Sequence, residues 1–270
     1  MAPLVSCWLL LLIASINQIV SSNEELAPGQ CPTGINTACP SSATCCPIFM
    51  SLSGYGCCNI GPDAVCCGQQ ACCPSGYTCI NTPPYTSVCT KDGQNISATQ
   101  VCTPGAQHPP STTKPSMIVI GDSVSIGYTP AVAADLNASI FVQHSPWAGG
   151  GGADDIANGI NCEECFLRTS MYTPANWDLI SFNFGLHNLD NHTESEDTYS
   201  ELLAKFTDRL LLTKSKLVYV TTTPFMPDQL FGNNVVQDLN ARARAIMAAR
   251  GVPVADLYQH VIDKVGPSSP

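Results

Sequence analysis

The chain has 270 residues, a formal net charge of −10 at neutral pH and 16 cysteines. A protein this acidic lacks the basic surface that phosphate groups require, so nucleic acids and anionic membranes are disfavoured as partners. The length allows one or two domains, and no stretch approaches the roughly 20 apolar residues of a membrane-spanning helix.

Residues 1–22 have the pattern of a secretory signal peptide. An apolar core, Trp8–Ile13, is followed by small residues that end at Ser22, where cleavage is expected. The segment before the core has no Lys or Arg, so a short buried helix is the alternative interpretation. We therefore expect a secreted, extracellular protein, and three glycosylation sequons agree with this compartment: Asn95, Asn137 and Asn191.

Residues 23–91 are rich in Cys, Pro, Gly and Ser, and show no helical periodicity. Such a cysteine density is typical of proteins that fold in an oxidising compartment, whereas a zinc-binding array is the alternative. Adjacent residues of an extended strand point to opposite faces, so each Cys-Cys pair can tie its strand to the segments before and after it. Four adjacent pairs are flanked by single cysteines in the order Cys31, Cys39, Cys45, Cys46, Cys57, Cys58, Cys66, Cys67, Cys72, Cys73, Cys79 and Cys89.

This order of cysteines resembles the granulin (epithelin) family, as does the ending Cys72-Cys73-Pro-Ser-Gly-Tyr-Thr-Cys79. The resemblance covers residues 31–89 and implies a small module of β-hairpins with six disulfides, which stabilise a segment that has few large apolar groups. It also implies a protein ligand for the module. Family members often carry Asp and His between the last two pairs, where this chain has residues 68–71, Gly-Gln-Gln-Ala, and this difference would change what the module binds.

Residues 92–115 lack apolar periodicity and contain Pro, Thr and Ser, which indicates an extended linker. Cys162-Glu-Glu-Cys165 lies beyond the linker and is either a redox pair or a structural disulfide in a surface loop. The structural disulfide is favoured, because the flanking carboxylates raise a thiol pKa. Cys102 then has no partner.

From Ser116 to Pro270 the sequence is typical of a globular α/β domain. Gly251 suits the end of the second predicted helix. Strands that alternate with helices predict a parallel sheet with helices on both faces, a three-layer, flavodoxin-like arrangement. The strands are expected at Met117–Ile120, Trp177–Gly185, Lys216–Thr222 and Val252–Leu257, and the helices at Thr198–Leu212 and Val235–Arg250.

Gly121-Asp122-Ser123 stands between the first of these strands and the start of a helix. This placement presents the Ser123 hydroxyl at the carboxyl edge of the sheet, with its N–H at a helix N-terminus that can stabilise an oxyanion. The alternative is a serine that only caps the helix. The block resembles the nucleophile motif of SGNH (GDSL-like) hydrolases, which implies a serine esterase acting on O-acyl or O-acetyl groups of glycans or on small esters, without metal or organic cofactor.

Two further blocks resemble the oxyanion hole of this family. One glycine of the run 149–152 would donate a backbone N–H, and we take Gly150; a plain flexible loop is the alternative. The segment Phe182-Asn183-Phe184-Gly185-Leu186-His187 resembles the family's Gly-x-Asn-Asp block with His187 in place of Asn. Asn183 or His187 would supply the side-chain donor, unless His187 is only packed at the strand end.

The family's C-terminal Asp-x-x-His block, whose histidine is the base, is not found between Ser116 and Pro270. Asp256 and His260 are weak candidates, since the pair has one intervening residue too many and comes early in the domain. We therefore expect an incomplete SGNH domain at residues 116–270 that cleaves p-nitrophenyl acetate little faster than buffer. The alternative function is a secreted, growth-factor-like binding protein whose granulin-like module acts and whose second domain is non-catalytic.

Overall fold

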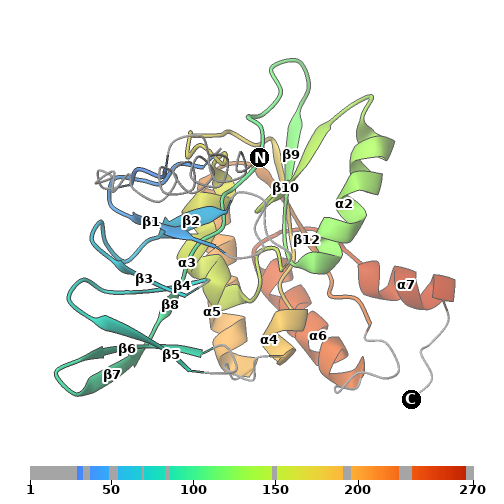
Figure 1. The fold of residues 1–270 in the computed structure, drawn as a ribbon. Helices are drawn as coiled ribbons and strands as arrows, with labels where there is room; N and C mark the ends of the chain where they lie inside the picture. The colour runs from blue at the N-terminus through green and yellow to red at the C-terminus, as the bar shows by residue number, and fades with distance from the viewer. Residues whose placement is uncertain are drawn as a thin grey trace, which may run out of the picture.

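A computed structural model describes residues 29–32, 37–48, 54–68, 70–82, 86–147, 151–190, 196–224 and 233–265. The predicted signal peptide, Gly150 and Asn191 lie outside the described residues. Figure 1 shows the short strands of the cysteine-rich module beside helix α3 (Ile156–Leu167) of an α/β domain. Among the described helices, none is both long and apolar enough to cross a membrane.

The module is a stack of short antiparallel strands. Its last two strands, at residues 94–97 and 99–100, lie within the segment whose composition indicates a linker. They pair with β6 and β4, because the open edges of those strands offer unpaired backbone groups. The sheets consist of β1 (Thr44–Pro47) with β2 (Tyr55–Cys58), β3 (Val65–Cys67) with β4 (Ala71–Cys73) and β8 (Thr99–Gln100), and β5 (Thr78–Thr82) with β6 (Thr86–Lys91) and β7 (Gln94–Ser97).

The twelve cysteines of the module are bonded to one another, as the sequence predicts. In each adjacent pair the first cysteine bonds to a segment earlier in the chain and the second to a later one. In this pairing all twelve sulfur atoms are in disulfides, and a disulfide sulfur is not the thiolate that zinc requires. The bridges are Cys31–Cys45, Cys39–Cys57, Cys46–Cys66, Cys58–Cys72, Cys67–Cys79 and Cys73–Cys89.

The predicted disulfide between Cys162 and Cys165 is wrong. Cys162 bonds instead to Cys102, which the backbone pairing with Cys57 of β2 holds in place, and Cys165 is free and buried. Both residues of the Cys-x-x-Cys motif lie in helix α3 rather than in a surface loop. Burial raises the pKa of the Cys165 thiol to about 12, which also argues against a redox pair.

Peptide mapping under non-reducing conditions tests this pairing. Digestion with a glutamate-specific protease separates Cys162 from Cys165, because Glu163 and Glu164 lie between them. We expect mass spectrometry to find a Cys102–Cys162 crosslink and an unmodified Cys165 thiol that alkylates only after unfolding. A crosslink between Cys162 and Cys165 would contradict the structure, and the reduced digest is the control.

The second part of the chain has the expected parallel α/β arrangement. Its five strands are mutually parallel in the order β10-β9-β11-β12-β13. Strand β10 and helices α3, α4 and α7 add to the elements that the sequence predicts. The strands are β9 (Ser116–Ile120), β10 (Phe141–Ser145), β11 (Leu179–Phe182), β12 (Lys216–Val220) and β13 (Val254–Ala255), and the other helices are α2 (Ser123–Leu136), α4 (Leu186–Asp190), α5 (Glu196–Leu212), α6 (Asn233–Ala249) and α7 (Leu257–Val265).

Alternate side chains of β9 enter two different cores, because successive residues of a strand face opposite sides of the sheet. Ile118 and Ile120 belong to the main core with residues of α3, α5 and α6, whereas Met117 and Val119 pack with residues of α2. Helix α2 thus lies across the sheet from α3 and α5 (Figure 1). This places the start of α2 at the carboxyl end of β9.

The chain between β8 and β9 is hydrogen-bonded to the C-terminal end of helix α3 and the residues that follow it. Ala106 donates its N–H to Arg168 O at 2.9 Å and accepts from Ser170 N–H at 2.7 Å. A Cβ on Gly105 would lie 2.1 Å from Arg168 O, so only glycine permits this approach. Together with the Cys102–Cys162 disulfide, these contacts attach the module to the α/β domain.

Candidate active site

Ser123 is the first residue of helix α2, directly after the end of β9. The helix cap is Asp122, whose Oδ1 accepts the N–H groups of Val124 at 2.9 Å and Ser125 at 3.4 Å. The alternative in which Ser123 is the capping residue is therefore wrong. Ser123 is exposed, whereas Asp122 and Ser125 on either side are buried, so the strand and the cap present its hydroxyl at the carboxyl edge of the sheet.

The glycine-rich segment lies against the Ser123 turn. Asp122 and Gly152 form an antiparallel bridge, and Ala153 donates its N–H to Gly121 O at 2.8 Å. Gly152 has φ +69°, and a Cβ at this position would lie 2.3 Å from Gly121 O. Glycine is required here for a close approach of two backbone segments, and among the described glycines of the run Gly152 lies against the Ser123 turn.

His187 is held by a carboxylate that sequence reasoning did not assign. Its Nδ1 lies 2.9 Å from Asp154 Oδ1, and each of the two side chains is 27% exposed. Asp154 follows the Asp122–Gly152 bridge by two residues, and His187 lies at the start of α4, after β11. Strand β11 pairs with β9, so the Asp154–His187 pair and Ser123 meet at the same edge of the sheet.

Burial, hydrogen bonds and neighbouring charges shift the pKa values of the two carboxyl groups at this edge, Asp154 and Asp122. Burial raises the pKa of Asp154, but the hydrogen bonds from His187 and Gln100 outweigh it, so the pKa is lowered and the carboxylate stays ionised. Burial raises the pKa of Asp122, against the hydrogen bond from the Val124 N–H and the charge of His187. His187 and Asp154 both influence Asp122, the residue next to Ser123.

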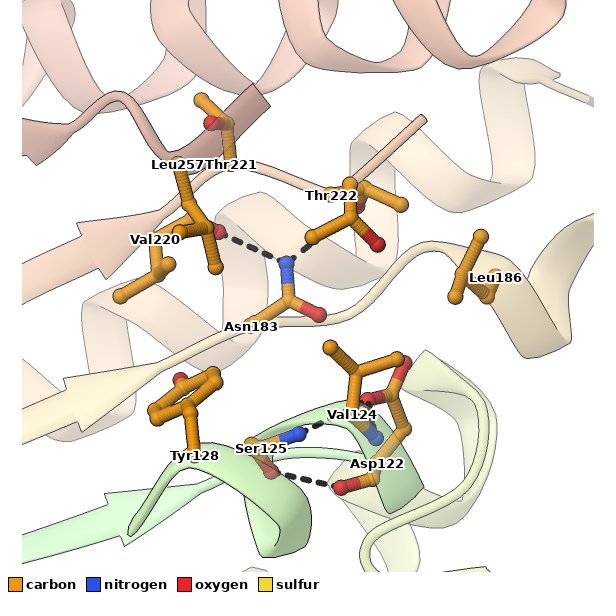
Figure 2. A pocket seen from close by; sticks show the side chains of 11 residues that line it. Asp122, Val124, Ser125, Tyr128, Asn183, Leu186, Val220, Thr221, Thr222 and Leu257 are labelled. Atoms are coloured by element: carbon orange, nitrogen blue, oxygen red, sulfur yellow. Dashed lines mark hydrogen bonds between the residues drawn. The ribbon is translucent and has the colours of Figure 1, made fainter. Parts of the chain in front are cut away.

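Asn183 faces β12 rather than the Ser123 turn. Its amide nitrogen donates to Val220 O at 2.7 Å and to Thr222 Oγ1 at 3.2 Å, as Figure 2 shows. Both amide hydrogens are used in these contacts, which leaves no donor for an oxyanion in this conformation. Of the two side-chain donors that the sequence suggests, His187 is the one whose charge acts on Asp122, the neighbour of Ser123.

A small hollow of about 220 Å³, part of it open solvent, lies at this edge of the sheet. Val124 and Leu186 line it from α2 and α4, while Leu257 and Thr222 line it from the opposite side (Figure 2). Leu186 directly precedes His187 and faces the start of α2. Ser123 and His187 are not among its lining residues, although their sequence neighbours Val124 and Leu186 are.

The structure pairs Asp256 with Arg244 rather than with His260. The Asp256 carboxylate lies 2.6 Å from Arg244 Nη2 and accepts the backbone N–H of Gln259 at 3.2 Å. Burial raises the pKa of Asp256, but these hydrogen bonds outweigh it and lower the pKa. His260 is exposed on α7. In this arrangement Asp256 caps α7 and does not orient the ring of His260.

A serine–histidine contact that the sequence analysis did not find lies next to the Ser123 turn, between Ser125 and His144. Ser125 Oγ lies 2.6 Å from His144 Nε2, and His144 Nδ1 lies 2.9 Å from Pro146 O. Burial lowers the pKa of His144 to about 4, so the ring is neutral. Because Ser125 is only 1% exposed, this pair supports the packing of α2 against β10 and does not present a nucleophile.

Curated relatives support the granulin resemblance. Human progranulin is 53% identical over 45 residues, 16% of this chain and 7% of progranulin, and rat progranulin is 43% identical over 74 residues, 27% of this chain and 11% of the relative. The chain thus matches about a tenth of the length of these relatives or less. No protein-family model matches the chain.

Solved structures that resemble the chain include several esterases and lipases. The acetyl xylan esterase AlAXEase is 14% identical, with a TM-score of 0.45, and the match covers 57% of this chain and 85% of that one. A lipase/acylhydrolase from Enterococcus faecalis is 21% identical, with a TM-score of 0.44, covering 57% of this chain and 80% of that one. A GDSL-like lipase from Bacteroides thetaiotaomicron is 15% identical, with a TM-score of 0.43, covering 57% and 74%. The cysteine-rich module is therefore similar in sequence to segments of progranulin.

Proposed function

We propose that the chain is a secreted serine ester hydrolase in which Ser123 is the nucleophile and His187 is the general base. The observation that carries this proposal is the 2.9 Å contact between His187 Nδ1 and Asp154 Oδ1 beside the exposed Ser123. A nucleophile, a base and a carboxylate that orients the base are the minimum set for acyl transfer. The carboxylate of Asp154 gives His187 an orienting partner that the sequence alone did not reveal, so we expect Ser123-dependent hydrolysis rather than a rate close to that of buffer.

The pairing with Asp154 determines which nitrogen of His187 carries the proton. An ionised carboxylate accepts from Nδ1–H, which leaves Nε2 free to take the proton of the Ser123 hydroxyl. Ser123 Oγ then attacks the acyl carbon, and the protonated ring gives its proton to the departing alcohol. In the second half, His187 takes a proton from water, the water oxygen attacks the acyl carbon, and the bond to Ser123 Oγ breaks to release the acid. The negative charge of Asp154 stabilises the imidazolium that forms in between.

The oxyanion would be stabilised mainly by backbone groups. The N–H of Ser123 is at the N-terminus of α2, where the helix dipole favours negative charge. A glycine of the run 149–152 is the second proposed donor, and the contact between Gly152 and Asp122 supports a position for this run close to the reaction. Asn183 could contribute only after releasing Val220 and Thr222.

The substrate we propose is a small ester or an O-acylated glycan with a short acyl group. The hollow lined by Val124 and Leu186, the sequence neighbours of Ser123 and His187, is small, and Leu257 adds a third apolar side chain to its lining. The net charge of −10 disfavours strongly anionic substrates. Secretion is supported by the disulfide ladder, and two of the proposed glycosylation sites, Asn95 and Asn137, are exposed.

Labelling with a fluorophosphonate probe tests the nucleophile. We expect the wild-type chain to be labelled on the peptide that contains Ser123 and the Ser123→Ala variant not to be labelled, because only an activated hydroxyl reacts. Ser75→Ala, which changes an exposed serine of the cysteine-rich module outside the three sequons, is the matched control and should label like the wild type. Labelling that survives Ser123→Ala would place the nucleophile elsewhere. A chain that neither labels nor hydrolyses esters would favour the growth-factor-like binding function.

A further inference from the structure

We infer that Gln100, in the last strand of the cysteine-rich module, is a positioning residue for the Asp154–His187 pair. The inference rests on the proposed function, and it makes the module part of the esterase site rather than a separate attachment. Gln100 does not touch the reacting atoms in this proposal. It acts on the base through Asp154.

The contacts form a continuous chain from the module to the histidine. Gln100 Nε2 donates to Asp154 Oδ2 at 3.1 Å, while Asp154 Oδ1 lies 2.9 Å from His187 Nδ1. Each carboxylate oxygen therefore has its own partner. A carboxylate held on both oxygens cannot rotate freely, so the direction of the bond to His187 is fixed.

Gln100 is itself anchored to both parts of the molecule. It pairs with Ala71 in the module, and its carbonyl accepts a hydrogen bond from Asn161 Nδ2 of α3 at 3.2 Å. Two residues later, Cys102 is joined to Cys162 on the same helix. The backbone that carries the Gln100 side chain is therefore tied to α3 by a disulfide only two residues away.

The hydrogen bond from Gln100 also adjusts the basicity of the pair. It is one of the contacts that hold the Asp154 pKa below its usual range despite burial. Without this donor, Asp154 becomes more basic, and its stronger attraction for the imidazolium raises the pKa of His187. The other carboxylates near the pair are Asp122, whose charge interacts with both members, and Asp155, which caps α3 through the Asn158 N–H.

The test is the pH dependence of kcat/KM for p-nitrophenyl acetate in Gln100→Leu. We expect the acid limb to move to higher pH by roughly 0.5–1 unit, the equivalent of one hydrogen bond, and kcat to fall by about 10-fold. Gln100→Glu keeps the shape of the side chain but places a second carboxylate against Asp154, and should move the acid limb further in the same direction. Gln94→Leu, the same change on the exposed strand β7, is the control and should leave the profile unchanged.

If Gln100 has a purely structural role, Gln100→Leu lowers kcat/KM equally at every pH and the acid limb of the pH profile does not move. This result would overturn the inference. A second readout does not depend on activity: NMR titration of the His187 ring should show a higher pKa in Gln100→Leu and Gln100→Glu than in the wild type. An unchanged His187 pKa in both variants would also overturn it. A shifted His187 pKa in a chain without Ser123-dependent hydrolysis would instead refute the proposed function and leave the coupling from Gln100 to His187 in place.

Discussion

Replacing His187 by alanine is expected to lower kcat for p-nitrophenyl acetate by about 10⁴–10⁶-fold, to the level of Ser123→Ala. The two variants should be equally inactive, because a serine hydroxyl without a base and a base without the serine leave only the same residual catalysis. Spectrophotometric rates for both single variants and for the double variant measure this. If the residues act as one unit, the double variant is no slower than either single variant.

His260→Ala is the informative control for this experiment. His260 is exposed on α7, and the carboxylate nearest in sequence, Asp256, is bound to Arg244, so we expect a rate close to that of the wild type. Full activity in His187→Ala combined with its loss in His260→Ala would show that His260 is the base. The assignment of His187 would then be wrong.

The pH profile separates a base from an oxyanion donor at position 187. A base must be neutral, so wild-type activity should rise as the pH increases through the His187 pKa. A charged oxyanion donor would give the opposite slope, and its removal would cost about 10²–10³-fold in kcat. Measurement of kcat between pH 4 and pH 9 therefore distinguishes the two roles of the same residue.

The order of the cysteines was sufficient to predict the module, because the alternation of adjacent residues along an extended strand directs each Cys-Cys pair to two different segments. The partner of Cys102 could not be predicted in the same way. The pairing depends on the path of the chain after β8, where the backbone of Cys102 pairs with Cys57. It also depends on Cys162 being on the buried face of helix α3. Neither has a local signature in the sequence.

The position of Ser123 was predictable because a strand, a tight turn and a helix start are all encoded within ten residues. Asp154 was not, although it stands two residues after the glycine run. Its role depends on the bridge between Asp122 and Gly152, which brings two segments 30 positions apart into contact, and on the histidine that follows β11. The contact between Gln100 and Asp154 joins the cysteine-rich module to the α/β domain, and no local pattern in the sequence predicts it.

Substitution of Asp154 by asparagine should lower kcat by about 10⁴-fold while leaving the fold intact. The amide has nearly the same shape as the carboxylate, but it can present an N–H to His187 Nδ1. The ring then carries its proton on Nε2 and cannot accept the proton of Ser123. In the wild type this does not happen, because the lowered pKa of Asp154 favours the ionised carboxylate, which only accepts hydrogen bonds.

Asp155→Asn is the matched control for this change. Asp155 is the next residue, but its carboxylate accepts the Asn158 N–H at 2.8 Å and caps the N-terminus of α3. We expect this variant to lose some thermal stability, since a charged helix cap is weakened, and to keep kcat within about 10-fold of the wild type. Circular dichroism melting curves and p-nitrophenyl acetate rates for both variants measure the two effects separately. Asp154→Asn with nearly normal kcat would show that the carboxylate does not orient the base, and the role assigned to the pair would have to be abandoned.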